Sequence, residues 1–383
     1  MKRINNVFQK IVSDENLKEA ILTVCNSHRW IRYPDKPNRT VVWLESNLEK
    51  CIQQLRQLIV EGFEPSPVTK KRRYDANAGK WRDIAEPKLW PDQCVHHALI
   101  QAIEPVMMRG MDKWCCGSIK ERGAHYGIRA VKKWMNNDHG GTKWCAELDI
   151  RHFYDSLKPE MVMQRMKQLI KDYRALDLIW RVIKDGIQIG AYCSQWFANT
   201  FLQPLDHKLR ETGIGVKHNI RYMDNFTLFS NRKRSLDKAI KAVEEWLNDH
   251  GLELKSNWQK FRVDKRMKKT DTHAEKMKRR LPNALGYRFG RDFILLRKHN
   301  LLRIIRQLKS FYFMRESGKF IPVKFAQGLL SRLGMLRHCN SVGIYKRFLK
   351  KHTQRQLKDV VREYKRKEMQ RWNMFLEASA AAA

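Results

Sequence analysis

The chain lacks any uninterrupted apolar run near the ~18–20 residues that a membrane-spanning helix needs. Its first residues, 1–5, have no apolar core of the kind found in secretory signal peptides. The eight cysteines form no Cys-x-x-Cys pair, which argues against a zinc site, and we expect them to be reduced. No internal repeat is evident. These absences predict a cytoplasmic protein with no membrane partner.

Acidic residues are scarce beside basic ones: 40 Asp and Glu stand against 76 Lys and Arg, a formal net charge of +36. Self-repulsion on this scale is tolerated mainly when the partner is a polyanion. The basic residues are interleaved with aromatic ones, including 12 tryptophans. A channel that combines phosphate contacts with base stacking has this composition. The sequence therefore favours a nucleic-acid partner over an anionic membrane surface.

Two aspartates stand at the ends of predicted strands. Residues 220–229 contain two short β-type runs, and we predict a hairpin with Asp224-Asn225 as its two-residue tip, because both residues tolerate positive φ. Upstream, Asp149 lies at the end of the apolar run 144–150. Such a hairpin alone can be an ordinary surface turn. Together, however, a hairpin carboxylate and a strand-end carboxylate are typical of sites that bind two Mg²⁺ ions for phosphoryl transfer.

The rest of the chain mixes helical and short β patterns. Residues 1 to about 65 are expected to be helical, with an amphipathic stretch at 48–59, and residues 298–377 are expected to be helical and basic. Further helices are expected at 90–108, 159–171, from 177 onward, 194–209 with Ser194 as its N-cap and a kink at Pro204, and 235–250. Residues 70–84 predict a hairpin with cations on both arms, although a solvated charge run has the same composition. The small, basic loop 117–125 is of a kind that lies along a phosphate backbone. We interpret the basic segment 265–280 as a mobile insertion that contacts such a backbone; a solvated loop is the alternative.

Taken in chain order, these segments resemble the motifs of reverse transcriptases. The matching set is Lys80-Trp81-Arg82, Asp149 with Phe153-Tyr154, Gly190 with Ser194, Tyr222-Met223-Asp224-Asn225, Gly251-Leu252-Glu253-Leu254, and Leu285-Gly286-Tyr287. Each motif is weak alone, but the full set in this order and spacing is specific. The resemblance implies an α+β right-hand polymerase with fingers, a palm built on an antiparallel sheet, and a helical thumb. The implied boundaries are 1–65 for an N-terminal helical extension, 66–140 for fingers, 141–290 for palm (with fingers helices inserted at about 159–185), 291–377 for thumb, and 378–383 for a low-complexity tail.

The resemblance also implies roles for individual residues. Asp149, Asp224 and Asn225 would be catalytic, and Asp149, Asp224 and the Ile150 carbonyl would bind two Mg²⁺ ions, with Mn²⁺ as the alternative metal. The incoming dNTP would contact Lys71, Arg73, Arg82, Tyr154, Ile189, Gly190, Ser194 and Gln195. Primer and template would contact Arg122, His125, Tyr222, Met223, Leu285, Gly286 and Tyr287. Candidate general acids for pyrophosphate are Lys255 and Lys260.

Among these residues, Tyr154 has the most specific implied role. Its ring would fill the space of a ribose 2′-hydroxyl and so select dNTPs over NTPs; an ordinary core aromatic is the alternative.

Three departures from the family pattern indicate which type of reverse transcriptase the chain resembles. Asn225 stands where a second aspartate is usual, which removes a negative charge and should weaken metal binding. Ile189-Gly190 replaces Gln-Gly, and Trp258-Gln259 stands where a lysine is usual. Both replacements resemble the reverse transcriptases of diversity-generating retroelements. In that group the missing glutamine is linked to misincorporation opposite template adenine.

The implied activity is synthesis of cDNA on a structured retroelement RNA, error-prone at adenine, by a bacterial or phage-encoded enzyme. Its ligands would be the template RNA, the RNA/DNA hybrid and dNTPs, and a basic oligomeric accessory protein would be a partner. We expect neither an RNase H domain nor a His/Asn/Cys nuclease cluster, which argues against a retroviral or full intron-encoded enzyme. Two alternatives stay open: a phage-defence reverse transcriptase that copies adenine faithfully, and a polymerase-like RNA-binding scaffold without catalysis, supported only by Asn225.

Overall fold

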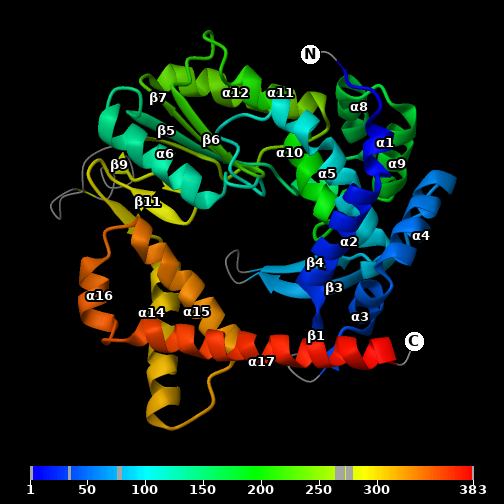
Figure 1. The fold of residues 1–383 in the computed structure, drawn as a ribbon. Coiled ribbons are helices and arrows are strands. Elements are labelled where there is room, and N and C mark those ends of the chain that lie inside the picture. Colours follow the sequence, from blue (N-terminus) through cyan, green and yellow to red (C-terminus); the bar gives the residue numbers. More distant parts are fainter. Residues whose placement is uncertain (1–2, 33–35, 76–79, 264–271, 273–278, 382–383) are drawn as a thin grey trace.

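The computed structural model describes residues 3–32, 36–75, 80–263, 272 and 279–381 (Figure 1). Helices and antiparallel sheets are both present, which confirms the α+β class. Most of the basic segment 265–280 lies outside the described residues, so its interpretation as an insertion stays a prediction. Within the described part of the chain, no helix combines the length and apolar character needed to cross a membrane.

A five-stranded sheet positions the candidate site. Its strand order is β6–β7–β5–β8–β9, with bounds His218–Tyr222, Asn225–Ser230, Trp144–Asp149, Gln259–Val263 and Arg279–Arg280. The pairs are antiparallel except β8 with β9. Side chains along β5 alternate between two layers: Ala146 and Leu148 enter one core, and Cys145 enters the other. Because strand side chains repeat every second residue, Glu147 and Asp149 lie on the Cys145 face.

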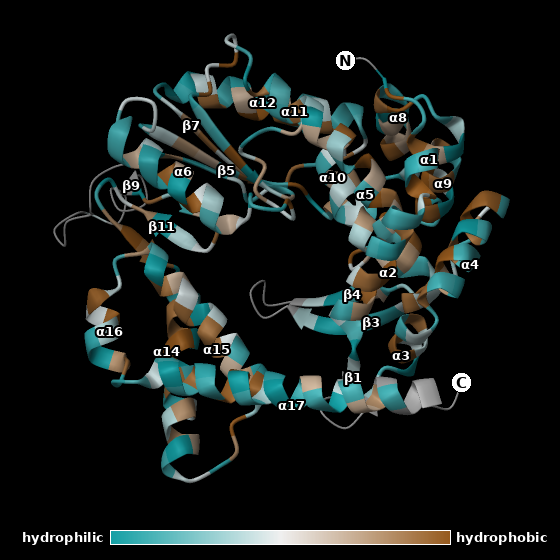
Figure 2. Ribbon diagram, viewed as in Figure 1, coloured by the Kyte–Doolittle hydropathy of each residue, from teal (hydrophilic) through white to brown (hydrophobic). Residues whose placement is uncertain are grey.

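The larger core joins one face of this sheet to the N-terminal helices. Its helices are α1 (Val7–Ile11), α2 (Asp14–His28), α3 (Arg39–Ser46), α4 (Leu48–Glu61), α5 (Cys94–Arg109), α7 (Phe153–Ser156), α8 (Pro159–Leu169), α9 (Tyr173–Ile183), α10 (Tyr192–Phe201), α11 (Gln203–Lys208) and α12 (Lys233–Asp249). Figure 2 shows hydrophobic residues gathered on β5, β7 and the helices around α5. The first 65 residues therefore share a core with the sheet.

One predicted helix differs from the structure. The segment expected at 194–209 is divided into α10 and α11, with Pro204 in the first turn of α11, where a missing backbone N–H costs nothing. The prediction that Ser194 caps the helix is wrong, because α10 begins at Tyr192 and Ser194 lies buried within it. A second helix, expected at 90–108, also differs: α5 begins at Cys94, after the short turn η1 (Leu89–Gln93), because Trp90 has non-helical backbone angles.

Two antiparallel hairpins lie beside these helices. The predicted basic hairpin is confirmed as β3 (Thr69–Asp75) paired with β4 (Lys80–Glu86), and a short pair is formed by β1 (Trp30–Arg32) and β2 (Lys36–Pro37).

A second core holds the C-terminal third together. It contains α6 (Ala124–Asn137), the three-stranded sheet β10 (Asn283–Ala284), β11 (Tyr287–Phe289) and β12 (Ile294–Leu296), and the elements α14 (Lys298–Glu316), α15 (Val323–Met335), η2 (Leu336–His338), α16 (Val342–Phe348) and α17 (Thr353–Ala381). The other face of the five-stranded sheet packs against this core through Cys145 and Phe229. The site therefore lies between two cores.

The last helix, α17, connects the two cores. Leu357 near its start is buried in the second core, and Trp372 near its end is buried in the first. The Trp372 indole donates to the Glu45 carboxylate at 2.8 Å, and its ring centroid lies 5.4 Å from that of Trp30. With 29 residues the helix is about 43 Å long. Figure 1 shows α17 running from the C-terminal helices to the N-terminal ones.

Candidate active site

The site begins at the turn between β6 and β7. Tyr222 pairs with Asn225, so the two turn residues are Met223 and Asp224. The predicted tip, Asp224-Asn225, is therefore shifted by one residue. The physical reason is that Asn225 belongs to β7, where it pairs with both Tyr222 and Asp149. Met223 takes the positive φ of the turn, at 55°.

The register brings the two predicted carboxylates to one place. Asp149 ends β5 opposite Asn225, and the Ile150 N–H donates to the Asp224 carbonyl at 3.2 Å. Burial and the neighbouring Asp149 charge raise the pKa of Asp224. The Asn225 amide donates to Asp224 Oδ1 at 3.0 Å. Both carboxylates line the same cleft.

The surroundings of these carboxylates fit a divalent cation. Asp149 Oδ1 is buried without a hydrogen-bond partner among the described atoms, and Asp149 Oδ2 contacts the Lys255 ammonium at 2.5 Å. Within the described ranges, no group of three or more His, Cys, Asp and Glu side chains has a metal-binding arrangement. Mg²⁺ often binds through one or two carboxylates and takes its other ligands from substrate phosphates and water. Two carboxylates beside an open cleft match that pattern.

The cleft has a volume of about 1040 Å³ and collects side chains from distant parts of the chain. The predicted residues that line it are Arg82, Asp149, Ile150, Tyr154, Ile189, Tyr222, Asp224, Asn225, Lys255, Leu285 and Gly286. Lining residues that were not predicted include Glu147, Arg297, His299, Asn300, Arg303 and Arg332. Glu147 could have been predicted from its two-residue spacing from Asp149, which puts both side chains on one face of the strand. The other five could have been predicted from the basic region after residue 290.

Tyr154 and Arg82 lie close to the carboxylates. Burial, followed by the Asp224 charge, raises the pKa of Tyr154. The positive charge of Arg82 acts in the opposite direction and lowers the pKa of both Tyr154 and Asp224. Arg82 comes from β4, while Tyr154 belongs to the short helix α7 directly after Asp149. The hairpin and the sheet thus face each other across the cleft.

The loop before α10 docks on the hairpin. The Ala85 N–H donates to the Ile189 carbonyl at 2.7 Å. Gly190 has φ +111°, and a Cβ atom there would lie 2.3 Å from the Ala85 carbonyl oxygen. Only glycine satisfies both constraints. Gly190 therefore brings Ile189 against the hairpin and into the cleft lining.

Other residues predicted to contact the nucleotide lie elsewhere. Lys71 and Arg73 both pair with Glu86 on their own hairpin. Ser194 is buried inside α10, and Gln195 is exposed on that helix outside the cleft lining. Of this set the structure brings Arg82, Tyr154 and Ile189 to the cleft lining, and the predicted contact of the buried Ser194 is wrong. For Lys71, Arg73, Gly190 and Gln195 the nucleotide contact stays a prediction.

The two candidate general acids lie on opposite sides of the sheet. Lys260 is paired across the strands with Ala146, whose side chain enters the first core, and its ammonium contacts Asp237 on α12. Lys255 instead contacts Asp149. The Lys260 prediction is wrong because the two-residue repeat of β8 directs its side chain away from Asp149.

Of the residues predicted to contact primer and template, some line the cleft and others do not. Tyr222 is 42% exposed and lines the cleft with Leu285 and Gly286. Tyr287 is buried and its hydroxyl donates to the Met335 carbonyl at 3.0 Å, so a direct primer contact by this side chain is wrong. His125 packs edge-on against His338, with ring centroids 4.0 Å apart. Arg122, His125 and Met223 are absent from the cleft lining.

A strand-end carboxylate and a turn carboxylate in one cleft, facing a basic hairpin and beside basic helices, form an arrangement that is typical of nucleotidyl-transfer sites of the palm type. Residues 68–288 match the family model described as reverse transcriptase (RNA-dependent DNA polymerase). This match covers more than half of the chain, so the chain belongs to the reverse transcriptase family. The resemblance of the motifs to those of reverse transcriptases is confirmed.

Individual known proteins are also similar to this chain, at 27% identity or less. Protein YkfC of Escherichia coli (strain K12) is 27% identical over 261 residues, which cover 64% of this chain and 66% of that protein. Group II intron-encoded protein LtrA of Lactococcus lactis subsp. cremoris is 23% identical over 175 residues, or 42% of this chain and 28% of that protein. The chain thus spans less than two thirds of the length of these relatives. Among solved structures, apo telomerase from Candida tropicalis has a TM-score of 0.48 at 11% identity and covers 81% of this chain and 64% of that one.

Proposed function

We propose that the protein is an RNA-directed DNA polymerase that uses Mg²⁺ and dNTPs to copy a template RNA into cDNA. The observation that supports this most directly is the convergence of Asp149 and Asp224 in a cleft lined by the basic hairpin, the sheet and the C-terminal helices. Asp149, Asp224 and the Ile150 carbonyl are the groups that would hold two Mg²⁺ ions. When bound, such ions would supply activation of the primer 3′-hydroxyl and neutralisation of charge on the triphosphate.

The chain's own residues bind and orient the substrates. Arg82 binds the triphosphate through charge-assisted hydrogen bonds. Tyr154 excludes the 2′-hydroxyl of a ribonucleotide. Leu285 and Gly286 hold the primer end, and Lys255 holds a proton at Nζ beside the site for transfer to pyrophosphate. The basic helices α14 and α15 bind the backbone of the RNA/DNA hybrid.

Primer extension tests the polymerase assignment. The protein is incubated with an annealed primer on an RNA template, Mg²⁺ and each dNTP in turn, and products are separated by length. We expect extension that depends on Mg²⁺ and on the complementary dNTP. Salt-sensitive RNA binding without extension would instead identify the RNA-binding scaffold, the alternative that Asn225 favours.

Within this function, we assign the protein to the diversity-generating type, acting on a structured retroelement RNA with a basic oligomeric accessory protein. The supporting observation is Ile189, an apolar side chain in the cleft lining where a glutamine is usual in the family. An apolar group there makes no hydrogen bond to the nucleotide or template base, so base selection relies on pairing alone.

Fidelity at template adenine tests this finer assignment. We expect the wild-type protein to misincorporate opposite adenine more than opposite the other three bases. Ile189→Gln should lower that misincorporation by about fivefold, since one well-placed hydrogen bond contributes about 1 kcal/mol. Sequencing of cDNA made on a defined template measures both. Equal error rates at all four bases would favour the phage-defence alternative.

Asn225 gives a prediction about metal affinity. Its amide donates to Asp224 Oδ1, so it occupies one acceptor lone pair and adds no charge. We expect Asn225→Asp to lower the Mg²⁺ concentration for half-maximal extension by about three- to tenfold, because a third carboxylate then attracts the cation. A Mg²⁺ titration of initial rates provides the measurement. An unchanged midpoint would place the Asn225 side chain outside the metal environment.

A further inference from the structure

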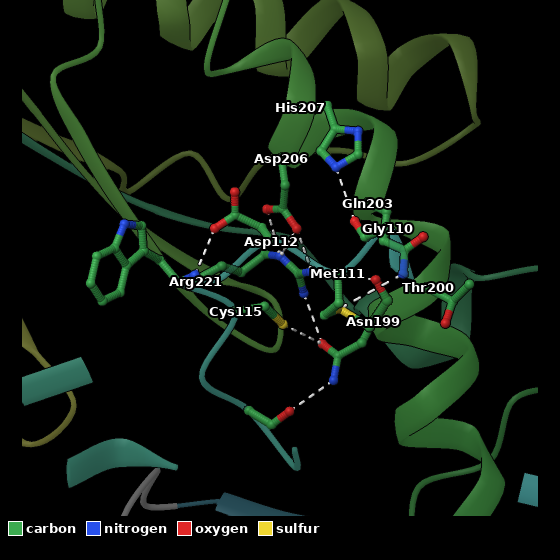
Figure 3. A network of polar contacts seen from close by, with 12 residues as sticks. Gly110, Met111, Asp112, Cys115, Asn199, Thr200, Gln203, Asp206, His207 and Arg221 are labelled. Carbon is green, nitrogen blue, oxygen red and sulfur yellow. Dashed lines mark hydrogen bonds and ion pairs between the residues drawn. The ribbon is translucent and has the colours of Figure 1, made fainter. Parts of the chain in front are cut away.

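Arg221 lies on β6, two residues before the Met223–Asp224 turn, and has no role in the chemistry described above. It is nevertheless a buried arginine, with only 1% of its surface exposed. Its guanidinium forms a bidentate pair with Asp206 of α11: Nε donates to Oδ1 at 2.8 Å and Nη2 to Oδ2 at 2.6 Å. Asp206 is likewise fully buried. Figure 3 shows Arg221 directed toward Asp206 and Asn199 in a network that continues to Asp112.

The remaining donors of Arg221 reach the turn itself. Nη1 donates to the Met223 carbonyl at 3.1 Å and to Asn199 Oδ1 at 2.8 Å. Met223 has φ 55°, a conformation that is unfavourable for a residue with a side chain and persists only when neighbouring contacts hold it. The Arg221 contact is therefore made to the strained residue that directly precedes Asp224.

The opposite side of the turn is held just as closely. A Cβ atom on Gly117 would lie 2.8 Å from the Met223 backbone nitrogen, so the chain passes there only because residue 117 is glycine. The Gly117 carbonyl accepts from the Asn199 amide at 2.8 Å. The Cys116 N–H donates to the Arg221 carbonyl at 2.8 Å. Residues 114–117 and Asn199 thus complete an enclosure around the Met223 backbone.

We propose that Arg221, held by Asp206 and Asn199, is a positioning residue that fixes the Met223 carbonyl and thereby the direction of the Asp224 carboxylate toward the metals. This inference rests on the proposed polymerase function. The proposed chemistry needs the Asp224 carboxylate. The contacts around the Met223 backbone determine the orientation of that carboxylate. A purely structural ion pair would instead stabilise the fold without any effect on metal binding.

The test removes the contact to Met223 while preserving the fold. Arg221→Met combined with Asp206→Leu replaces a buried ion pair by apolar side chains, which is commonly neutral for stability. Arg221→Lys is the second variant, because it keeps a charge beside Asp206 but loses the planar fork that reaches Met223. Arg165→Gln is the matched control, since Arg165 donates to Thr200 and Gln203 on the same two helices without touching the turn.

Two readouts are used: Mn²⁺ affinity, from the loss of the free-ion electron paramagnetic resonance signal, and the kcat and KM of primer extension. We expect a Mn²⁺ Kd that is about 10- to 100-fold higher in both Arg221 variants, as is typical when a group that orients a metal ligand is removed. Extension should lose kcat by a similar factor with little change in KM for the primer–template. Arg165→Gln should match the wild type in both.

Wild-type Mn²⁺ affinity and kcat in a folded double variant would overturn the inference. If the double variant unfolds by circular dichroism, Arg221→Lys decides by the same measure. Failure of the polymerase proposal is distinguishable, because a wild-type protein that binds Mn²⁺ but extends no primer loses the proposed function while the affinity ratio still tests Arg221.

Discussion

Alanine at either Asp149 or Asp224 should lower the rate of primer extension by about 10³-fold or more, a loss of roughly 4 kcal/mol in transition-state stabilisation. Each substitution removes one carboxylate of the Asp149–Asp224 pair, which lines the cleft at the end of the sheet. The Asp149 substitution also leaves the Lys255 ammonium without its partner, which adds positive charge where a cation is to bind. Single-turnover extension of a labelled primer on RNA measures the rates.

The matched control for this experiment is Asp237→Asn. Asp237 is also an aspartate paired with a lysine, but it lies on α12, on the other side of the sheet. We expect wild-type rates from this variant. Extension by Asp149→Ala at the wild-type rate, with the control intact, would remove the carboxylate pair from the chemistry and leave only RNA binding.

Tyr154→Ala should let the enzyme incorporate ribonucleotides, with the preference for dNTPs over NTPs falling by about 100-fold. The Tyr154 ring packs on Phe153, with centroids 5.6 Å apart, and lines the cleft beside Asp224. Removing the ring opens space next to the sugar, and a pocket discriminates between ligands that differ by one small group by about 10- to 200-fold.

The ratio of kcat/KM for a dNTP to that for the matching NTP is the quantity to measure. Tyr154→Phe separates ring from hydroxyl, and we expect it to retain the sugar preference. An unchanged ratio in Tyr154→Ala would mean that Tyr154 is an ordinary core aromatic and that another residue excludes the 2′-hydroxyl.

The sequence predicted the site where the chemistry restricts residue type over a short stretch. Asp149 at the end of an apolar run and Asp224 in a predicted hairpin were sufficient to predict that two carboxylates lie together. Strand ends and turns can be recognised from short stretches of sequence. The tip was misplaced by one residue, since the choice between Met223 and Asn225 depends on the contact of Met223 with Gly117 and on the pairing of Asn225 with Asp149, both far away in the sequence. Local turn propensity favoured Asn225, and tertiary contacts favoured Met223.

The side of a strand that a residue occupies was harder to predict. Lys255 and Lys260 are both lysines and lie five residues apart, yet only the pairing register shows which one reaches Asp149. Tyr287 belongs to a recognisable motif, but its burial depends on packing against Met335. The motif spacing predicted which segments meet, whereas the register and core packing determined which side chains enter the cleft.

The anchoring of α17 at both ends has a mechanical consequence. A helix fixed in two cores behaves as a strut, so the C-terminal helices cannot swing away from the sheet unless α17 bends or Trp372 leaves its buried position. Removing a buried tryptophan from its contacts costs about 3–5 kcal/mol. Within the proposed function, the buried indole of Trp372 therefore limits how far the helices that would hold the duplex can move away from the sheet.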